Sequence, residues 1–238
     1  MCGVVLSIGN TYFLEQANNM NRKVGKLKVP LPIFKFFYDL VKEQFPKLYD
    51  KVAKKVIREK YVASCGMIVA MLFSIVCCIT AAGVETMIRR HGLLDKPDET
   101  IPVSMFVLLP QFLFLGALDG VSNFSIKRFF TDRAPAPMIR YSQIFSYGVI
   151  GAGTVGGVLS VYVVGKASES GGKPSWFQDT LIKSRLDNYY WTLAVLSSIN
   201  LVLYILVAQW YTYKDHQLKN EESTQPYEDD ELCCCCCG

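Results

Sequence analysis

The sequence predicts an all-α membrane protein, and three observations carry the prediction: composition, the length of uncharged stretches, and the placement of aromatic residues. Of the 238 residues, 51% are hydrophobic and only 19% are charged, and the mean hydropathy of +0.22 is unusual for a water-soluble globule. Three stretches without a charged side chain are long enough to cross a bilayer core, which takes roughly 20 helical residues. One of them, residues 188–213, has aromatic residues at both ends, as at membrane interfaces.

The same composition excludes several other classes of protein. The net charge of +4 is small and dispersed, so we expect no nucleic-acid partner. The nine cysteines form neither a disulfide ladder nor two CxxC pairs, and His91 and His216 stand apart, so we expect no metal and no other cofactor. Because the sequence shows no Ser/His/Asp set, phosphate loop or HExxH motif, we do not expect an enzyme.

The first two predicted helices are not complete apolar spans. Residues 1–20 open with an apolar stretch too short to cross a bilayer alone, so we expect the outer end of a span whose beginning is missing. Residues 31–50 place apolar and charged residues on opposite helical faces, with Pro46 allowing a kink. This helix either lies on a membrane surface or lines an aqueous cavity with its charged face, and the sequence does not decide between the two.

Four longer predicted spans follow, near residues 61–88, 101–126, 139–165 and 187–213. The second of these contains Pro110 and a lone carboxylate, Asp119. An acid within a span is costly unless it faces protein or water, so Asp119 is a candidate functional residue. The alternative is that the helix ends near Gly120 and leaves Asp119 among lipid headgroups.

The predicted span at 139–165 is rich in glycine. Small residues spaced four apart let a neighbouring backbone approach closely, so we expect tight helix packing there. Ordinary packing is one interpretation, and a sliding or gating contact is the other. The glycines concerned are Gly148, Gly153, Gly156 and Gly157.

Residues 214–238 form a polar tail with an acidic end, which we expect to be disordered. Its terminal run of cysteines is a candidate for S-acylation, which would add membrane affinity; the alternative is an exposed thiol tract or a mispredicted end. The run consists of Cys233, Cys234, Cys235, Cys236 and Cys237. The expected localisation is that of a multi-pass integral membrane protein, with plasma and vacuolar membranes not distinguished.

Three strings resemble one known family. They are GNTYFLEQANNMNRK at 9–23, IPVSMFVLLPQFLFLGALDGVSNFSIKRFFTDRAP at 101–135, and GGKPSWFQDTLIKSRLDNYYWTLAVLSSINLVLYILVAQWYTYK at 171–214. Together they resemble the plant nitrate transporter/peptide transporter family, the proton-dependent oligopeptide transporter branch of the major facilitator superfamily. The resemblance implies half of a major facilitator fold, with residues 1–213 as the C-terminal six-helix half and the first of those helices truncated. It also implies that helices one to six, with the family's first-helix proton-coupling motif, are absent from this sequence.

The resemblance further suggests four site residues. Glu15 and Gln16 fall on the seventh-helix motif, whose acid is linked to proton coupling in related peptide transporters; the alternative for Glu15 is a loop position at the membrane face. Asp119 matches the first acid of the tenth-helix pattern, and Arg128 replaces the second, which peptide transporters use for a substrate's amino terminus. An arginine there could favour an anion through its planar fork, or merely anchor the helix at headgroups.

Two functions are compatible with these expectations. In the first, the chain is a fragment or truncated form of a proton-coupled symporter, whose partners in a complete transporter are protons, membrane lipid and a small solute: nitrate, a peptide or another metabolite. Alternating access needs two halves around a midplane site, so we expect no transport by this chain alone. In the second, the chain does not transport and instead binds a full-length transporter or a complementary N-terminal half.

Overall fold

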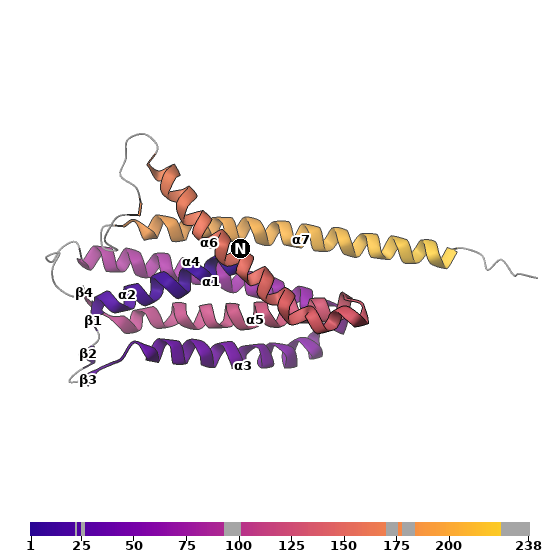
Figure 1. Cartoon of the computed structure of the whole chain (residues 1–238), viewed down its shortest axis with the longest axis horizontal. Helices are drawn as coiled ribbons and strands as arrows, with labels where there is room; N and C mark the ends of the chain where they lie inside the picture. Colours follow the sequence, from indigo (N-terminus) through magenta and orange to yellow (C-terminus); the bar gives the residue numbers. More distant parts are fainter. Residues whose placement is uncertain (22, 25–26, 93–100, 170–175, 178–183, 225–238) are drawn as a thin grey trace, which may run out of the picture. The chain divides into compact units, whose positions relative to one another are not determined.

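The computed structural model describes residues 1–21, 23–24, 27–92, 101–169, 176–177 and 184–224, and long helices make up most of them (Figure 1). The chain divides into two units, Met1–Val202 and Leu203–Gly238. The described part of the second unit is the end of one long helix, so everything that follows concerns the first unit unless stated otherwise.

The helices begin with three consecutive helical segments, of which the middle one is a π-helical turn. They are α1 (Cys2–Ile8), η1 (Gly9–Phe13) and α2 (Leu14–Asn19). The long helices are α3 (Pro32–Val56), α4 (Val62–Gly92), α5 (Leu109–Arg133), α6 (Ser142–Ser168) and α7 (Leu186–Thr224). Short 3₁₀ turns precede three of them, namely η2 (Glu59–Tyr61), η3 (Met105–Leu108) and η4 (Ala136–Tyr141).

A few extended residues connect the helices. The strand β1 (Met20–Asn21) pairs in parallel with β4 (Ile101–Ser104), and β2 (Lys23–Val24) pairs antiparallel with β3 (Leu27–Lys28). These pairs are too short to form a core of their own, because independently stable sheets need three or more strands. The predicted all-α class is therefore confirmed, with a helical bundle of the kind expected for half of a major facilitator fold.

Within the described residues, four helical stretches have the length and apolar composition of membrane spans. They are Glu59–Arg90, Met105–Asp132, Pro137–Ser168 and Leu186–Lys214. The second begins with 3₁₀ turn η3 rather than at residue 101, and its helix α5 runs on to Arg133. Pro110 lies in the first turn of α5, where a missing N–H removes no helical hydrogen bond. Because α5 continues past Gly120, Asp119 lies in the middle of a helix and not at its end.

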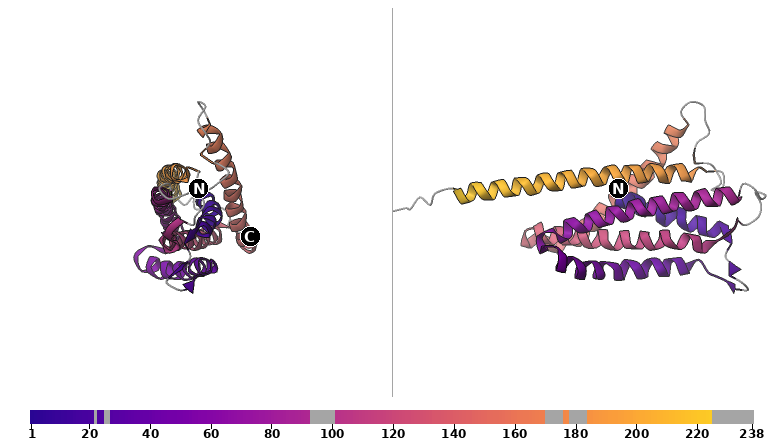
Figure 2. Two further views of the ribbon diagram at one scale, coloured as in Figure 1. Left: turned by 90° about the vertical axis from the view of Figure 1, so that its left-hand side faces the viewer. Right: turned by 180° about the vertical axis from the view of Figure 1, so that it is seen from behind.

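Helix α3 packs along α5, and the two helices run in the same direction. The sequence left undecided whether residues 31–50 lie on a membrane surface or line a cavity. The Phe34 ring stacks on Phe112 at 5.0 Å between centroids, and further along both helices Tyr49 contacts Phe124 at 6.1 Å. Gly116 allows this approach, because a Cβ atom there would lie 2.5 Å from the carbonyl oxygen of Tyr38. Figure 2 shows α3, α4 and α5 side by side, so α3 is a helix of the bundle and not an isolated surface helix.

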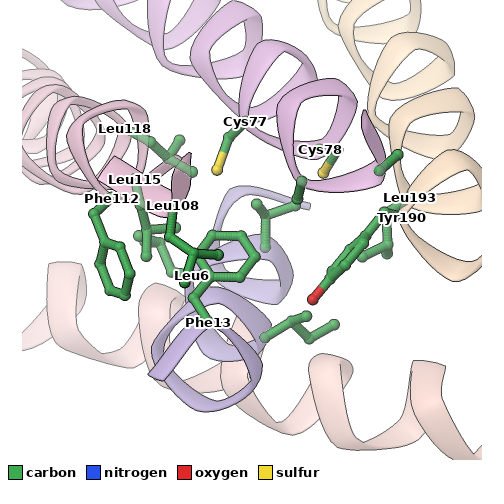
Figure 3. Packing of buried hydrophobic residues seen from close by; sticks show 14 of the residues in the cluster. Leu6, Phe13, Cys77, Cys78, Leu108, Phe112, Leu115, Leu118, Tyr190 and Leu193 are labelled. Carbon is green, nitrogen blue, oxygen red and sulfur yellow. The ribbon is translucent and has the colours of Figure 1, made fainter. Parts of the chain in front are cut away.

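The core lies where the first helical segments insert between α4, α5 and α7. Figure 3 shows the side chains that meet there, with Leu6 and Phe13 facing Cys77, Phe112 and Tyr190. Phe13 contacts the rings of both Phe112 and Tyr190 edge-on, each at 5.9 Å between centroids. In a bilayer such close packing, more than apolar burial, holds helices together, because lipid tails are as apolar as the side chains.

In the second unit, the described part of the tail does not have the structure that its composition predicts. Helix α7 continues to Thr224, so residues 214–224 are helical and not disordered as predicted from composition. A helix that already exists can be extended at little cost, because nucleation is the expensive step. Gln217 adds a hydrogen bond from Nε2 to the hydroxyl of Tyr213, 2.8 Å long, one turn earlier. The remaining tail residues, including the cysteine run Cys233 to Cys237, lie outside the described residues.

Candidate functional site

Asp119 lies at the centre of a polar cluster on the bundle helices. Lys42 places its Nζ atom 2.7 Å from Oδ2 of Asp119, and the hydroxyl of Tyr38 donates to the same oxygen. Asn123 donates from Nδ2 to Oδ1 of Asp119 at 2.6 Å. Both carboxylate oxygens are therefore hydrogen-bonded. We call Tyr38, Lys42, Asp119 and Asn123 the Asp119 cluster.

Helical spacing on two neighbouring helices builds this cluster. Tyr38 and Lys42 are one turn apart on α3, and Asp119 and Asn123 are one turn apart on α5. Residues four apart lie on one helical face, so each helix offers a pair of polar groups to the other. Gly120 assists, because an added Cβ atom there would collide with the backbone of α3 at Lys42.

Two further segments contact the rim of the cluster. Asn10 of η1 shares a side-chain hydrogen bond with Tyr38, and the hydroxyl of Ser146 in α6 lies 3.4 Å from Oδ1 of Asn123. The cluster thus connects the first helical segment with α3, α5 and α6. The side chain of Asp119 is 8% exposed, whereas that of Lys42 is 43% exposed. The ion pair therefore joins a buried acid to a base that the described chain leaves partly exposed, and pairing of this kind is how an acid inside a span is tolerated.

Arg128 lies near the C-terminal end of α5, away from this cluster, and carboxylates surround it. Its guanidinium contacts Asp50 and Glu59 at 3.0 Å each and Asp132 at 3.7 Å. It thereby ties α3 and η2 to α5. Its positive charge is balanced by protein groups, so an anion would have to displace those carboxylates to bind there, and the side chain is only 16% exposed.

The adjacent residues Glu15 and Gln16 point in different directions, because neighbouring helical positions are about 100° apart. Glu15 is exposed, whereas Gln16 is buried and donates from Nε2 to Oε2 of Glu85 on α4 at 2.5 Å. The structure therefore does not bring Glu15 and Asp119 together into one site. It brings Gln16 to a second buried acid, Glu85, instead.

Three of the four glycines lie against α1, and one does not. A Cβ atom on Gly153 would lie 2.6 Å from the Cα atom of Gly3, and one on Gly157 would lie 3.1 Å from Cβ of Ser7. Gly156 faces Val4 at an ordinary van der Waals distance of 3.4 Å. Gly148 has no neighbour within 4 Å of such a Cβ atom in the part of the chain that the structure describes. The glycine face therefore forms a close contact between α1 and α6 over two turns.

Sequence reasoning missed three polar residues of these sites: Tyr38, Lys42 and Glu85. Tyr38 and Lys42 belong to the predicted amphipathic helix 31–50, and their spacing of four, which puts both on one helical face, is the signal that could have found them. Glu85 lies within the predicted span 61–88, but no sequence pattern indicates its contact with Gln16, which is 69 residues away. Within the described ranges, no three His, Cys, Asp or Glu side chains are placed to hold a metal ion.

Comparison with known proteins gives a consistent assignment. The PTR2 model of the POT family matches residues 2–177. In Arabidopsis thaliana, Protein NRT1/ PTR FAMILY 5.5 is 38% identical over 88% of this chain and 41% of its own length. Protein NRT1/ PTR FAMILY 4.5 is 32% identical over 86% of this chain and 38% of its own length, and Protein NRT1/ PTR FAMILY 5.12 is 30% identical over 89% and 40%.

The chain therefore spans about 40% of the length of the curated relatives it matches. The resemblance noted in the sequence is confirmed, and with four helices suited to crossing a bilayer the protein is a multi-pass integral membrane protein. Since the family match covers well over half of its residues, the chain belongs to the POT family of membrane transporters.

Proposed function

We propose that this chain forms one wall of the pathway of a proton-coupled solute symporter, with Asp119 and Lys42 coupling the proton to the solute. The observation that carries the proposal is the ion pair between Lys42 and Asp119, 2.7 Å long, within the helices of a transporter-family bundle. Ionisable residues inside spans are costly, and they commonly mark ion and proton pathways.

The pair offers a simple coupling chemistry. When Asp119 is ionised, it holds the ammonium group of Lys42. A proton on Asp119 removes that negative charge and leaves Lys42 able to pair with an oxyanion of the solute, such as nitrate or a peptide carboxylate. Tyr38 and Asn123 remain hydrogen-bonded to the carboxyl group and keep it in position. Loss of the proton restores the ion pair and releases the anion.

The exposure of the cluster residues is consistent with a site that forms only one wall of a solute pathway. Lys42 is exposed on one side of the cluster, while Asp119 is buried between α5 and α3. Alternating access in transporters built from repeated halves occurs around a site between the two halves. We therefore propose that a complementary N-terminal half supplies the opposite wall, and that the chain alone does not transport.

The test is reconstitution into proteoliposomes of this chain with the N-terminal half of Protein NRT1/ PTR FAMILY 5.5, with nitrate and a dipeptide as separate probes. We expect uptake of one probe driven by a pH gradient when both halves are present, and none with this chain alone. Asp119→Asn and Lys42→Met should each abolish the gradient-driven component.

Matched controls lie one turn away on α3. Lys35 and Asp39 form an exposed pair, 3.9 Å apart, so Lys35→Met and Asp39→Asn remove the same kinds of charge without removing either member of the Lys42–Asp119 ion pair. These controls should retain uptake. Gradient-driven uptake by the chain alone, or undiminished uptake by the Asp119→Asn variant, would contradict the proposal.

A second candidate function is favoured by the exposure of α6. Only 6% of the residues in its most apolar window are buried, against 67% for α5. We propose as the alternative that α6 binds a full-length transporter or a separate N-terminal half without transport. The test is co-purification with Protein NRT1/ PTR FAMILY 5.5 from detergent extracts. Retention that is lost with Val155→Trp, which enlarges this side of α6 without adding a charge to the span, would support it, and an exclusively monomeric chain would exclude it.

A further inference from the structure

A second buried acid, Glu85, lies apart from the Asp119 cluster. It belongs to α4, within the apolar stretch Glu59–Arg90, and its residue is 3% exposed. Its carboxyl oxygen Oε2 accepts a hydrogen bond from Nε2 of Gln16 in α2, which is 4% exposed. The pair joins two helical segments that are 69 residues apart in the chain.

Among the residues that the structure describes, an ionised Glu85 would have no counter-ion of its own. The ionisable groups that interact with it are Arg89 on its own helix and Asp187 and Tyr190 on α7. Arg89 already pairs with Asp187 at 2.8 Å. Asp187 carries a like charge and Tyr190 is a neutral phenol. A buried carboxylate that lacks a counter-ion is so unfavourable that such groups take up a proton instead.

The hydrogen bonding of Gln16 independently indicates that Glu85 carries a proton. The amide oxygen Oε1 of Gln16 is buried and has no hydrogen-bond partner in the described chain. An ionised carboxylate only accepts hydrogen bonds, so it cannot satisfy an orphaned amide oxygen. A protonated carboxyl group has one O–H donor, and an acid and an amide side by side can each donate to the other.

We propose that Glu85 is a proton-binding site, in which the neutral acid accepts a hydrogen bond from Nε2 of Gln16 and donates its own O–H to Oε1 of the same amide. The bound proton removes a buried charge and satisfies a buried acceptor in one step. It fastens α2 to α4 inside this chain. The site stands on these contacts alone and does not depend on whether the Asp119 cluster transports a solute.

The experiment is infrared spectroscopy of the full chain in lipid nanodiscs at neutral pH. A protonated carboxyl group has a C=O stretching band separate from the bands of ionised carboxylates. We expect such a band in the wild-type chain and its loss in Glu85→Gln, which keeps the size and hydrogen-bonding capacity of the neutral acid. Asp119→Asn is the matched control and should keep the band, because Asp119 is paired with Lys42.

Two further measurements complete the test. The first assigns the band even if Glu85→Gln does not fold, and the second tests whether Gln16 is the partner of the acid. Labelling the wild-type chain with ¹³C-glutamate should shift the band, which assigns it to a glutamate without any substitution. Gln16→Met should move the band to higher frequency, because the carbonyl loses its hydrogen bond from Nε2. Absence of a glutamate acid band at neutral pH would overturn the proton site. A band that does not move in Gln16→Met would overturn the acid–amide pair.

Discussion

At the scale of single residues, the charged groups inside this bundle have protein partners. Asp119 is paired with Lys42, and Arg128 is surrounded by Asp50, Glu59 and Asp132. Removing one member of a buried pair costs more than the pair contributes, because the other charge stays behind without compensation. The middle and the C-terminal end of α5 therefore respond differently to substitution: Asp119 pairs with one cation, Lys42, while Arg128 shares its charge with several carboxylates.

The first prediction concerns the stability of the Asp119 cluster. Lys42→Met leaves the carboxylate of Asp119 without its cation, and we expect a loss of about 1–3 kcal/mol in the free energy of unfolding. This is below the cost for a fully buried pair, because Lys42 is 43% exposed and is only partly desolvated by the protein. The measurement is unfolding in mixed micelles by detergent titration.

The double variant Lys42→Met/Asp119→Asn tests the reason for this loss. With the acid neutralised as well, no uncompensated charge remains, so most of the lost stability should return. Lys35→Met on the exposed side of α3 should change stability by less than about 0.5 kcal/mol. If the double variant is as unstable as the sum of both single variants, the two side chains are not energetically coupled.

At the scale of helices, glycines decide which helices come close. On α5, Gly116 and Gly120 admit the backbone of α3, and this contact brings Lys42 to Asp119. On α6, Gly153 admits the backbone of α1 at Gly3, while Gly148 faces no neighbour among the described residues. The glycine-rich sequence predicted a packing face in general. Which glycines it would include depends on the partner helix, which sequence spacing alone does not specify.

The second prediction is that substitutions of Gly153 and Gly148 affect stability differently. Gly153→Leu inserts a side chain where only 2.6 Å separates an added Cβ atom from the Cα atom of Gly3, so α1 and α6 must move apart. We expect a loss of about 1–3 kcal/mol or more, the usual cost of overpacking. Gly148→Leu is the matched control in the same helix and should be nearly neutral. Both can be compared by detergent-induced unfolding, and an equal loss in both variants would show that the contact with Gly3 is not responsible, because Leu has a higher helix propensity than Gly at either position.

At the scale of the whole molecule, the properties that depend on local sequence were predictable. Uncharged stretches of sufficient length identified the spans, because a bilayer imposes a minimum apolar length on any helix that crosses it. The position of 31–50 and the burial of Glu85 were not predictable, since both depend on contacts with residues far away in the chain, Asp119 and Gln16. The helix at 214–224 was missed because composition does not register that a preceding helix can be extended.

The same reasoning leads to a last prediction about α6. Its exposed apolar side suits lipid or an apolar partner helix, since few of its residues are buried within this chain. Val155 is 61% exposed near the middle of α6, so Val155→Arg places a charge where insertion costs about 2.5–3.5 kcal/mol.

Membrane insertion into microsomes, followed by engineered glycosylation sites on either side of α6, measures that cost. We expect inefficient insertion of α6 in Val155→Arg. Tyr141→Arg is the control, because it lies at the start of α6, where a long basic side chain reaches the headgroups, and it should insert normally. Equal insertion of Val155→Arg and the wild-type chain would mean that this side of α6 faces water, which would place it in the solute pathway together with Lys42 rather than against lipid.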